Sequence, residues 1–351
     1  KRQGEAAADP IERWENLLNP YRPGRPLTER GLFYGRETLM HALRSVIENG
    51  SHAVLIGERQ SGKTTVLQQL RLELAEEAAQ GVAVRGAYID LAGLQPHEFF
   101  ETILRLTVEQ MNDPRLAAEP QIPRPYTSTH FERDLGELLA FLQDSLGSGV
   151  RLALLLDEAD ELLNYPQAFH ASLQHIFSSP AAERLSVILA GRGLQHGWRR
   201  PDPPFYASYP VYPLPPLTRE DAVRLITEPA ADIFKYEPDA LELILENAQG
   251  RPADLQAVCQ RLVNDLLASG ERLVTARHVR EALGQAKLAR GELLSQAGRL
   301  LAEMLDWVED NPDAPQADLQ ARLKQTWEEL GRAMVKGVAK IRSGTGHRPG
   351  S

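Results

Sequence analysis

The residues best suited to chemistry form a short glycine-bounded loop at residues 57–64. They are Gly-Glu-Arg-Gln-Ser-Gly-Lys-Thr, which satisfies the pattern G-x-x-x-x-G-K-[ST]. In such a loop the backbone N–H groups surround phosphate oxygens, and the following helix adds the positive end of its dipole. Lys63 would reach the β- and γ-phosphates, and the hydroxyl of Thr64 would bind Mg²⁺. The predicted phosphate-binding residues are Gly57, Glu58, Arg59, Gln60, Ser61, Gly62, Lys63, Thr64 and Thr65.

An acidic pair, Asp157-Glu158, directly follows the aliphatic run at residues 152–156. An acidic residue at the carboxyl end of a parallel strand lies at the ligand crevice of an α/β sheet. We expect Asp157 to hold Mg²⁺ through water and Glu158 to polarise the attacking water. Such a pair can also cap a helix, but the preceding phosphate loop favours the catalytic interpretation. Asp160 and Glu161 are interpreted as solvated residues in the first turn of the next helix.

These side chains need strands that deliver them to one edge of a sheet. Apolar runs predict strands at residues 53–56, 82–91, 151–156, 185–190 and 209–212. Amphipathic segments predict helices at residues 36–49, 63–80, 97–111, 131–146 and 167–177. The alternation predicts an α/β fold, a P-loop NTPase core whose parallel sheet is covered by helices on both faces.

The chain divides into four predicted parts. Residues 1–30 form an N-terminal extension, and residues 31–216 form the nucleotide-binding core. Residues 217–290 form an all-helical lid, which begins at a capping-box-like Thr218-Arg-Glu-Asp221 and could include a winged helix. Residues 291–351 form a C-terminal helical segment with a flexible tail.

The bulk composition is that of a globular protein, with 42% hydrophobic and 25% charged residues. A net charge of −9 argues against a broadly basic surface, although it is compatible with a local basic patch. Cys259 is the single cysteine, so the sequence has no intrachain disulfide and no thiolate metal cluster. No apolar run is long enough to span a bilayer, and we expect a cytoplasmic protein. The sequence begins at Lys1 without a signal core, and we interpret it as a fragment.

Four further motifs occur in a fixed order around the phosphate loop. Residues 33–37 (Phe-Tyr-Gly-Arg-Glu) resemble an "FVGRE" box, and Arg192 follows a strand as in "LLTTR" motifs. Residues 214–222 resemble the "L.PLT.EEA" entry to a lid, and residues 250–252 (Gly-Arg-Pro) resemble a GxP motif. Residues 19–285 therefore resemble STAND ATPases, the AAA+-related group that includes NACHT and NB-ARC switches.

That resemblance implies roles for residues outside the loop. It assigns Gly35, Arg36 and Glu37 to the base side of the nucleotide, Arg192 to sensing the γ-phosphate, and Pro252 to packing on the nucleotide. Arg36 and Glu37 are also explained as first-turn helix charges, and Pro252 as a simple helix start. The predicted catalytic residues are Glu158, Lys63 and Arg192, the predicted metal ligands are Thr64 and Asp157, and the predicted cofactors are ATP or ADP with Mg²⁺.

The resemblance favours a slowly hydrolysing ATP switch whose lid position and assembly change with the nucleotide. Its expected partners are further copies of the chain in the ATP state and protein effectors or sensors. The helix after Pro252 lacks the arginine that many AAA+ machines carry one turn in, which supports the STAND interpretation. Arg199 and Arg200 stand where AAA+ proteins place a trans-acting arginine finger, but an arginine pair in a polar loop is usually just solvated.

The alternative is a DNA-handling AAA+ ATPase of the origin-recognition or transposition-regulator type. Residues 272–280 could begin a winged helix, or they could be a lid helix with a solvated basic face. Residues 332–342 are basic and amphipathic, which fits either a membrane or nucleic-acid contact or a frayed terminal helix. A small-molecule kinase fits poorly, because Glu158 suits water activation and P-loop kinases seldom carry this set of motifs.

Overall fold

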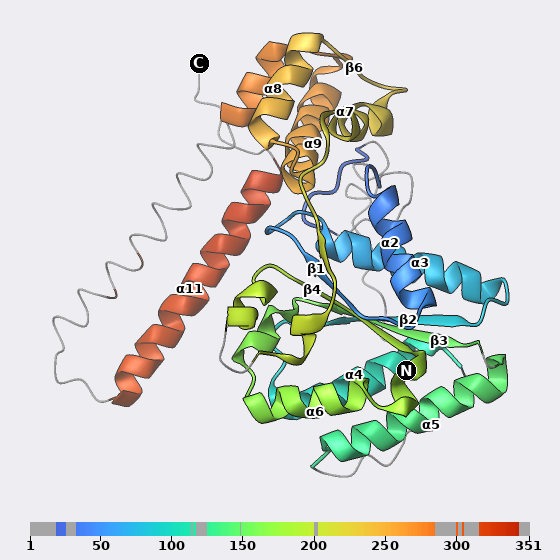
Figure 1. Ribbon diagram of the computed structural model, residues 1–351. Helices are drawn as coiled ribbons and strands as arrows, with labels where there is room; N and C mark the ends of the chain where they lie inside the picture. Colours follow the sequence, from blue (N-terminus) through green and yellow to red (C-terminus); the bar gives the residue numbers. More distant parts are fainter. Residues whose placement is uncertain are drawn as a thin grey trace. The chain divides into compact units, whose positions relative to one another are not determined.

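The computed structural model describes residues 19–25, 33–113, 115–116, 125–147, 149–199, 203–284 and 316–343, together with Leu300 and Met304 (Figure 1). The chain divides into two compact units. One unit comprises residues 24–217, and the other comprises the residues before and after it.

The first unit is built on a parallel sheet of five strands in the order β2-β3-β4-β1-β5 (Figure 1). The strands are β1 (Ala53–Ile56), β2 (Val84–Asp90), β3 (Arg151–Asp157), β4 (Leu185–Gly191) and β5 (Val211–Pro213). All four pairs of neighbouring strands are parallel, so the carboxyl ends of the strands share one edge of the sheet. The predicted parallel α/β fold is confirmed. The last strand begins two residues later than predicted, because Tyr209 still donates its N–H to the preceding turn at Tyr206.

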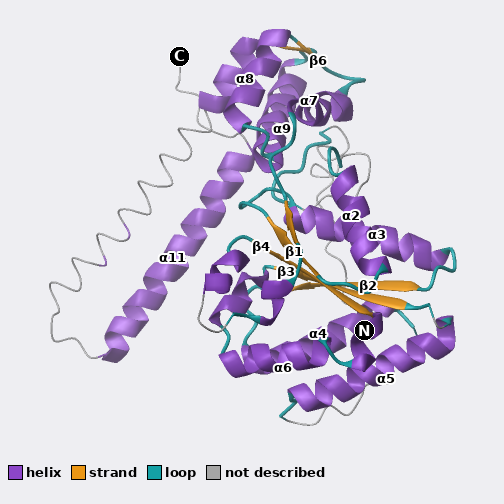
Figure 2. Cartoon of the chain, viewed as in Figure 1, coloured by secondary structure: helices purple, strands orange, loops and turns teal. Residues whose placement is uncertain are grey.

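Helices cover both faces of this sheet (Figure 2). Helices α2 (Glu37–Glu48) and α3 (Lys63–Ala79) pack on one face, with strand residues such as Leu55 and Leu155. Helices α4 (Pro96–Met111), α5 (Ser128–Leu146) and α6 (Gln167–Phe177) pack on the other, with Val54 and Leu154. Successive side chains of a strand point to opposite faces, and helices cover both faces of this sheet. Strand β3 is therefore buried along nearly its whole length. Burial of each aliphatic side chain stabilises the fold by about 1.5–3 kcal/mol. The buried strands therefore hold in place the strand ends that carry the site.

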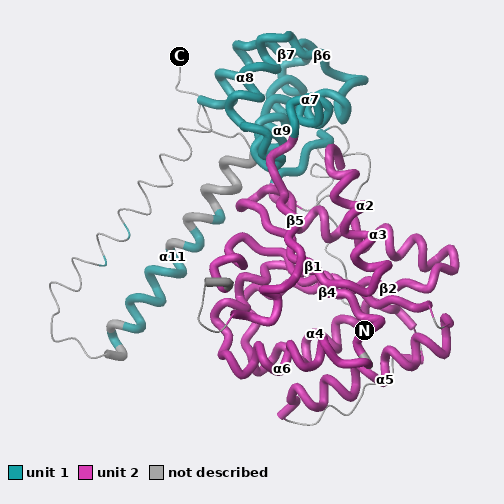
Figure 3. Tube along the Cα trace, in the orientation of Figure 1, with its two compact units in different colours: residues 1–23, 218–351 teal, residues 24–217 magenta. Residues whose placement is uncertain are grey.

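The second unit is mainly helical (Figure 3). Its elements are α7 (Arg219–Thr227), α8 (Pro238–Ala248), α9 (Pro252–Ser269), α11 (Gln316–Ser343) and the short strands β6 (Lys235–Tyr236) and β7 (Leu273–Val274). Helix α7 begins as predicted, because the hydroxyl of Thr218 accepts the N–H of Asp221 and caps the first turn. Strands β6 and β7 pair in parallel, so β7, within residues 272–280, belongs to a small sheet of this unit.

The segment at residues 19–23 packs in this second unit although it precedes the core in sequence. The side chain of Tyr21 is 1% exposed, and its hydroxyl donates to the carbonyl of Ile226. The amide of Asn19 donates to the carbonyl of Gln260 at 2.8 Å. The chain therefore passes between the two units twice. In the described part of the chain, no helix is both long enough and apolar enough to cross a bilayer.

Candidate nucleotide-binding site

The phosphate loop joins the end of β1 to the start of α3, as its sequence requires. Gly62 has φ +100°, which glycine adopts without strain, and a Cβ placed on it would meet no atom within 4 Å. Gly57 is needed for a different reason, since a Cβ there would lie 2.5 Å from the hydroxyl of Ser61. The first N–H groups of α3 have no acceptor inside the helix. The loop therefore offers backbone N–H donors to a bound anion.

Lys63 lies over this loop. Its side chain is buried, and its ammonium donates to the carbonyls of Gly57 at 2.9 Å and Glu58 at 3.1 Å. Within the described residues, the hydroxyl of Ser61 is buried without a hydrogen-bond partner. A buried polar atom without a partner is costly, and a phosphate oxygen would satisfy it. The loop therefore fits a nucleotide phosphate.

Asp157 ends β3 and is 1% exposed. One carboxylate oxygen accepts the hydroxyl of Tyr88 at 3.0 Å, and the other accepts the N–H of Glu158 at 2.9 Å. No group of three His, Cys, Asp or Glu side chains in the described residues could hold a metal ion. Mg²⁺ at nucleotide sites typically takes one or two protein ligands and completes its shell with water and phosphate. Thr64 and Asp157 are compatible with that donor set.

Glu158 follows with φ +47°, in the left-handed region. This conformation costs a side-chain-bearing residue about 1–3 kcal/mol, and such strain is typical of functional sites. Burial, and then the negative charge of Asp157, raise the pKa of Glu158, whereas the positive charge of Lys63 lowers it. Glu158 is therefore within electrostatic range of the phosphate-loop lysine, where a general base would act.

Arg192 follows β4, the strand beside β1. Its Nε lies 3.5 Å from a carboxylate oxygen of Glu58 in the phosphate loop, and both side chains are exposed. The structure thus brings the loop, the acidic pair and Arg192 to the same edge of the sheet.

Asp160 and Glu161 lie in the first turn of the helix at Ala159–Asn164, as predicted, but Asp160 is not simply solvated. Its two carboxylate oxygens accept the backbone N–H groups of Arg192 and Gly193, each at 2.6 Å. Glu161 is also bonded, because it accepts the N–H of Gly93 at 3.2 Å. In the sequence, the two glycines that flank Arg192 could have indicated this contact, since a Cβ on Gly191 would lie 3.1 Å from Asp160. Tyr88 was also missed, because its role depends on the register between β2 and β3.

The remaining predicted residues lie further from this cluster in sequence. Arg36 is buried and donates to the carbonyl of Pro215 at 2.6 Å, and Gly35 has φ +67°. Pro252 is the first residue of α9 in the second unit. The assignment of Gly35, Arg36 and Pro252 to the nucleotide stays a prediction. The side chain of Arg199 and the whole of Arg200 lie outside the described residues.

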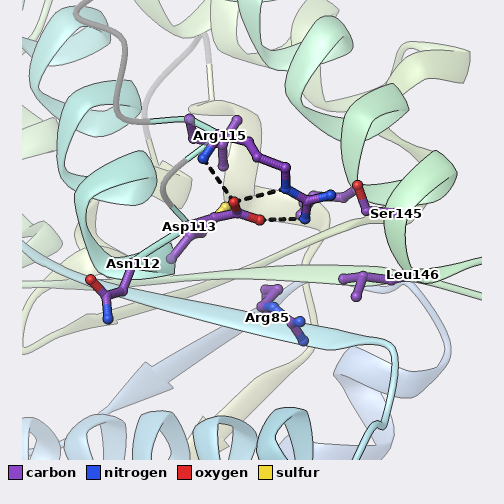
Figure 4. Close-up of a pocket in the computed structure, with 9 residues that line it drawn as sticks. Arg85, Asn112, Asp113, Arg115, Ser145 and Leu146 are labelled. Carbon is purple, nitrogen blue, oxygen red and sulfur yellow. Dashed lines mark hydrogen bonds and ion pairs between the residues drawn. The ribbon is translucent and has the colours of Figure 1, made fainter.

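A surface cavity of about 270 Å³ occurs elsewhere in the first unit (Figure 4). Its lining includes Arg85 at the start of β2 and residues at the ends of α4 and α5, so it lies at the edge of the sheet opposite the phosphate loop. Arg115 in its wall is neutralised by Asp113 at 2.6 Å. This cavity plays no part in the nucleotide site.

Residues 46–194 match the family model described as an AAA domain. The fold of the chain resembles that of the ORC1 protein of Aeropyrum pernix in complex with DNA, with a TM-score of 0.53 at 18% identity, covering 84% of this chain and 77% of that one. A Walker-type ATPase of Pyrococcus abyssi matches with a TM-score of 0.56 at 19% identity, covering 88% and 92%. Cdc6p of Pyrobaculum aerophilum matches with a TM-score of 0.51 at 16% identity, covering 94% and 89%.

A search of curated proteins found no match. At these identities the structural matches establish the fold alone.

Proposed function

We propose that this protein is a Mg²⁺-dependent ATPase of the AAA+ type that handles DNA. The observation that carries the ATPase assignment is the convergence of Lys63, Asp157 and Glu158 at the open phosphate loop. ATP or ADP is the proposed cofactor, with Thr64 and Asp157 holding Mg²⁺.

Each residue has a task in the proposed reaction. Lys63 donates to phosphate oxygens and offsets their charge, and bound Mg²⁺ would neutralise further charge on the transferred phosphate. Glu158 accepts a proton from the attacking water, which its raised pKa favours near neutral pH. The guanidinium of Arg192 lies beside Glu58 of the phosphate loop, and at this place Arg192 would distinguish ATP from ADP.

The proposal that the protein handles DNA is supported by the likeness of its fold to ORC1 and by exposed arginine side chains. The fold resembles ORC1 in complex with DNA, and the likeness covers most of both chains. Arg272 and Arg280 are exposed on the second unit, so they are available to phosphates of DNA although the whole chain is acidic. Arg277 is also exposed, and it is paired with Glu281 at 3.8 Å.

A STAND-like switch is the second candidate, and the start of α9 favours it. Pro252 occupies the first turn, and residues 253–260 contain no arginine that could act as a lid sensor. Arg251 is held by Asp254 at 2.6 Å. Under this candidate the ATP state would assemble and engage protein effectors instead of DNA.

A gel-shift titration with duplex DNA at several salt concentrations separates the candidates. We expect binding that weakens with salt, since released counterions drive phosphate contacts. Replacing Arg272 and Arg280 by Glu should weaken this binding, whereas Arg105→Glu, which reverses an exposed helical charge in the other unit, should not. Absence of binding at low salt with both ATP and ADP would remove the DNA assignment and leave the switch.

A further inference from the structure

The hydroxyl of Tyr88 lies between the two elements that carry the predicted Mg²⁺ ligands. It donates to Asp157 at the end of β3 at 3.0 Å. The side chain of Gln68 on α3 interacts with the same phenol. Gln68 lies four residues after Thr64, so both side chains are on the same side of α3. One phenol therefore connects the strand of one predicted ligand with the helix of the other.

The register of the sheet explains why Tyr88 occupies this place. Strand β2 pairs with β3 so that Tyr88 lies opposite Leu155 and Asp90 lies opposite Asp157. Side chains two residues apart share a face, so Tyr88 is on the same face as Leu155 and Asp157. That face is the one covered by α2 and α3. A slip of one residue would turn Tyr88 away from the site.

The hydrogen bonds around Tyr88 have defined directions. Gln68 accepts the Nε–H of Arg71 through its amide oxygen at 3.1 Å, so its NH₂ group is the part that can face the Tyr88 oxygen. The phenol can then donate only toward Asp157.

Tyr88 thus restricts the rotation of the Asp157 carboxylate. In the described part of the chain, the donors to that carboxylate are the Tyr88 hydroxyl and the N–H of Glu158, one to each oxygen. Each oxygen keeps a second lone pair for metal-bound water. Mg²⁺ demands nearly ideal octahedral geometry, so the orientation of a carboxylate that holds its water affects how tightly it binds.

We propose that Tyr88 is a positioning residue for Mg²⁺ that orients Asp157 and ties it, through Gln68, to the helix that carries Thr64. The proposal rests on the proposed ATPase function. It predicts a specific loss, in which nucleotide affinity without metal is kept and the response to Mg²⁺ is weakened.

The test is a Mg²⁺ titration of fluorescent-ADP binding to wild type and Tyr88→Phe, starting in EDTA. We expect equal affinities in EDTA and a Mg²⁺ midpoint for Tyr88→Phe that is higher by about 10-fold or more, the usual effect of removing a partner of a metal ligand. Tyr212→Phe is the matched control, because Tyr212 packs against the same face of the sheet on β5, away from β3. Its titration should coincide with that of wild type.

The other outcomes are equally decisive. An unchanged Mg²⁺ midpoint in Tyr88→Phe, or an equal loss of affinity in EDTA and in Mg²⁺, would overturn the positioning role and leave the nucleotide site intact. A wild-type protein that binds no nucleotide would instead overturn the proposed function. If Tyr88→Phe does not fold, Gln68→Ala gives the same readout, with a smaller expected shift in the same direction. An unchanged midpoint there would overturn the link to α3.

Discussion

The carboxylate of Asp160 lies 2.6 Å from the backbone nitrogen of Arg192. Its second oxygen lies at the same distance from the nitrogen of Gly193. Asp160 is three residues beyond Asp157, so the segment after β3 fixes the turn after β4. The position of the predicted γ-phosphate sensor therefore depends on a residue outside the phosphate loop.

Replacing Asp160 by Ala should reduce the preference for ATP over ADP. Two charge-assisted hydrogen bonds, from the backbone N–H groups of Arg192 and Gly193, would be lost. We expect the ratio of the two affinities to fall by about tenfold. Titration calorimetry with ADP and with a non-hydrolysable ATP analogue measures this ratio. Glu161→Ala is the control, because Glu161 bonds to Gly93 instead. An unchanged ratio in Asp160→Ala would show that the turn holds Arg192 without this carboxylate.

Much of the core could be predicted from sequence because its signals are local. The strand at residues 53–56 and the helix at residues 167–177 have the predicted bounds, since an aliphatic run and a helical apolar period each specify one element. The pattern at residues 57–64 likewise specifies a loop between a strand and a helix, which the structure shows. The parallel sheet follows from their alternation.

Contacts between distant residues could not be predicted in this way. Asp160 and Arg192 are 32 residues apart, and Tyr88 and Asp157 are 69 apart. The burial of Tyr21 against residues that follow the core depends on tertiary packing that no local pattern encodes. Sequence therefore predicted the local elements of the site better than the long-range contacts that hold them together.

Adding a methyl group at Gly57 should disturb the phosphate loop. The new Cβ of Gly57→Ala would lie 2.5 Å from the Ser61 hydroxyl and 3.0 Å from the Leu214 Cβ. Overpacking of this kind costs about 1–3 kcal/mol, so the free energy of unfolding and the nucleotide affinity should both fall. Thermal melts with and without ADP measure the two effects. Gly149→Ala, where the Cβ meets no atom within 4 Å, should melt as wild type does. An undisturbed Gly57→Ala would contradict the close packing of the loop.

Glu158→Gln should separate ATP binding from hydrolysis. The substitution keeps the size of the side chain but removes the proton acceptor, so we expect ATP binding to remain and turnover to fall by about 100-fold or more. Phosphate release under single-turnover conditions measures the rate. Turnover equal to wild type would mean that another group activates the water.

The same variant allows assembly to be tested in a stable ATP state. We expect Glu158→Gln to form a defined multimer with ATP and Mg²⁺ but not with ADP, as measured by size exclusion with light scattering. If it does, Arg199 and Arg200 become candidates for the trans-acting residue and can be replaced singly. A monomer in both nucleotides would contradict the predicted ATP-dependent assembly.

The most direct test of the proposed nucleotide site is ATP binding to Lys63→Ala, measured by titration calorimetry in the presence of Mg²⁺. Lys63 is the buried cation of the phosphate loop, so we expect saturable binding by wild type and none measurable by the variant. Lys235→Ala removes the same charge from an exposed strand of the other unit and should bind as wild type does. Undiminished affinity in Lys63→Ala would contradict the assignment of the nucleotide site.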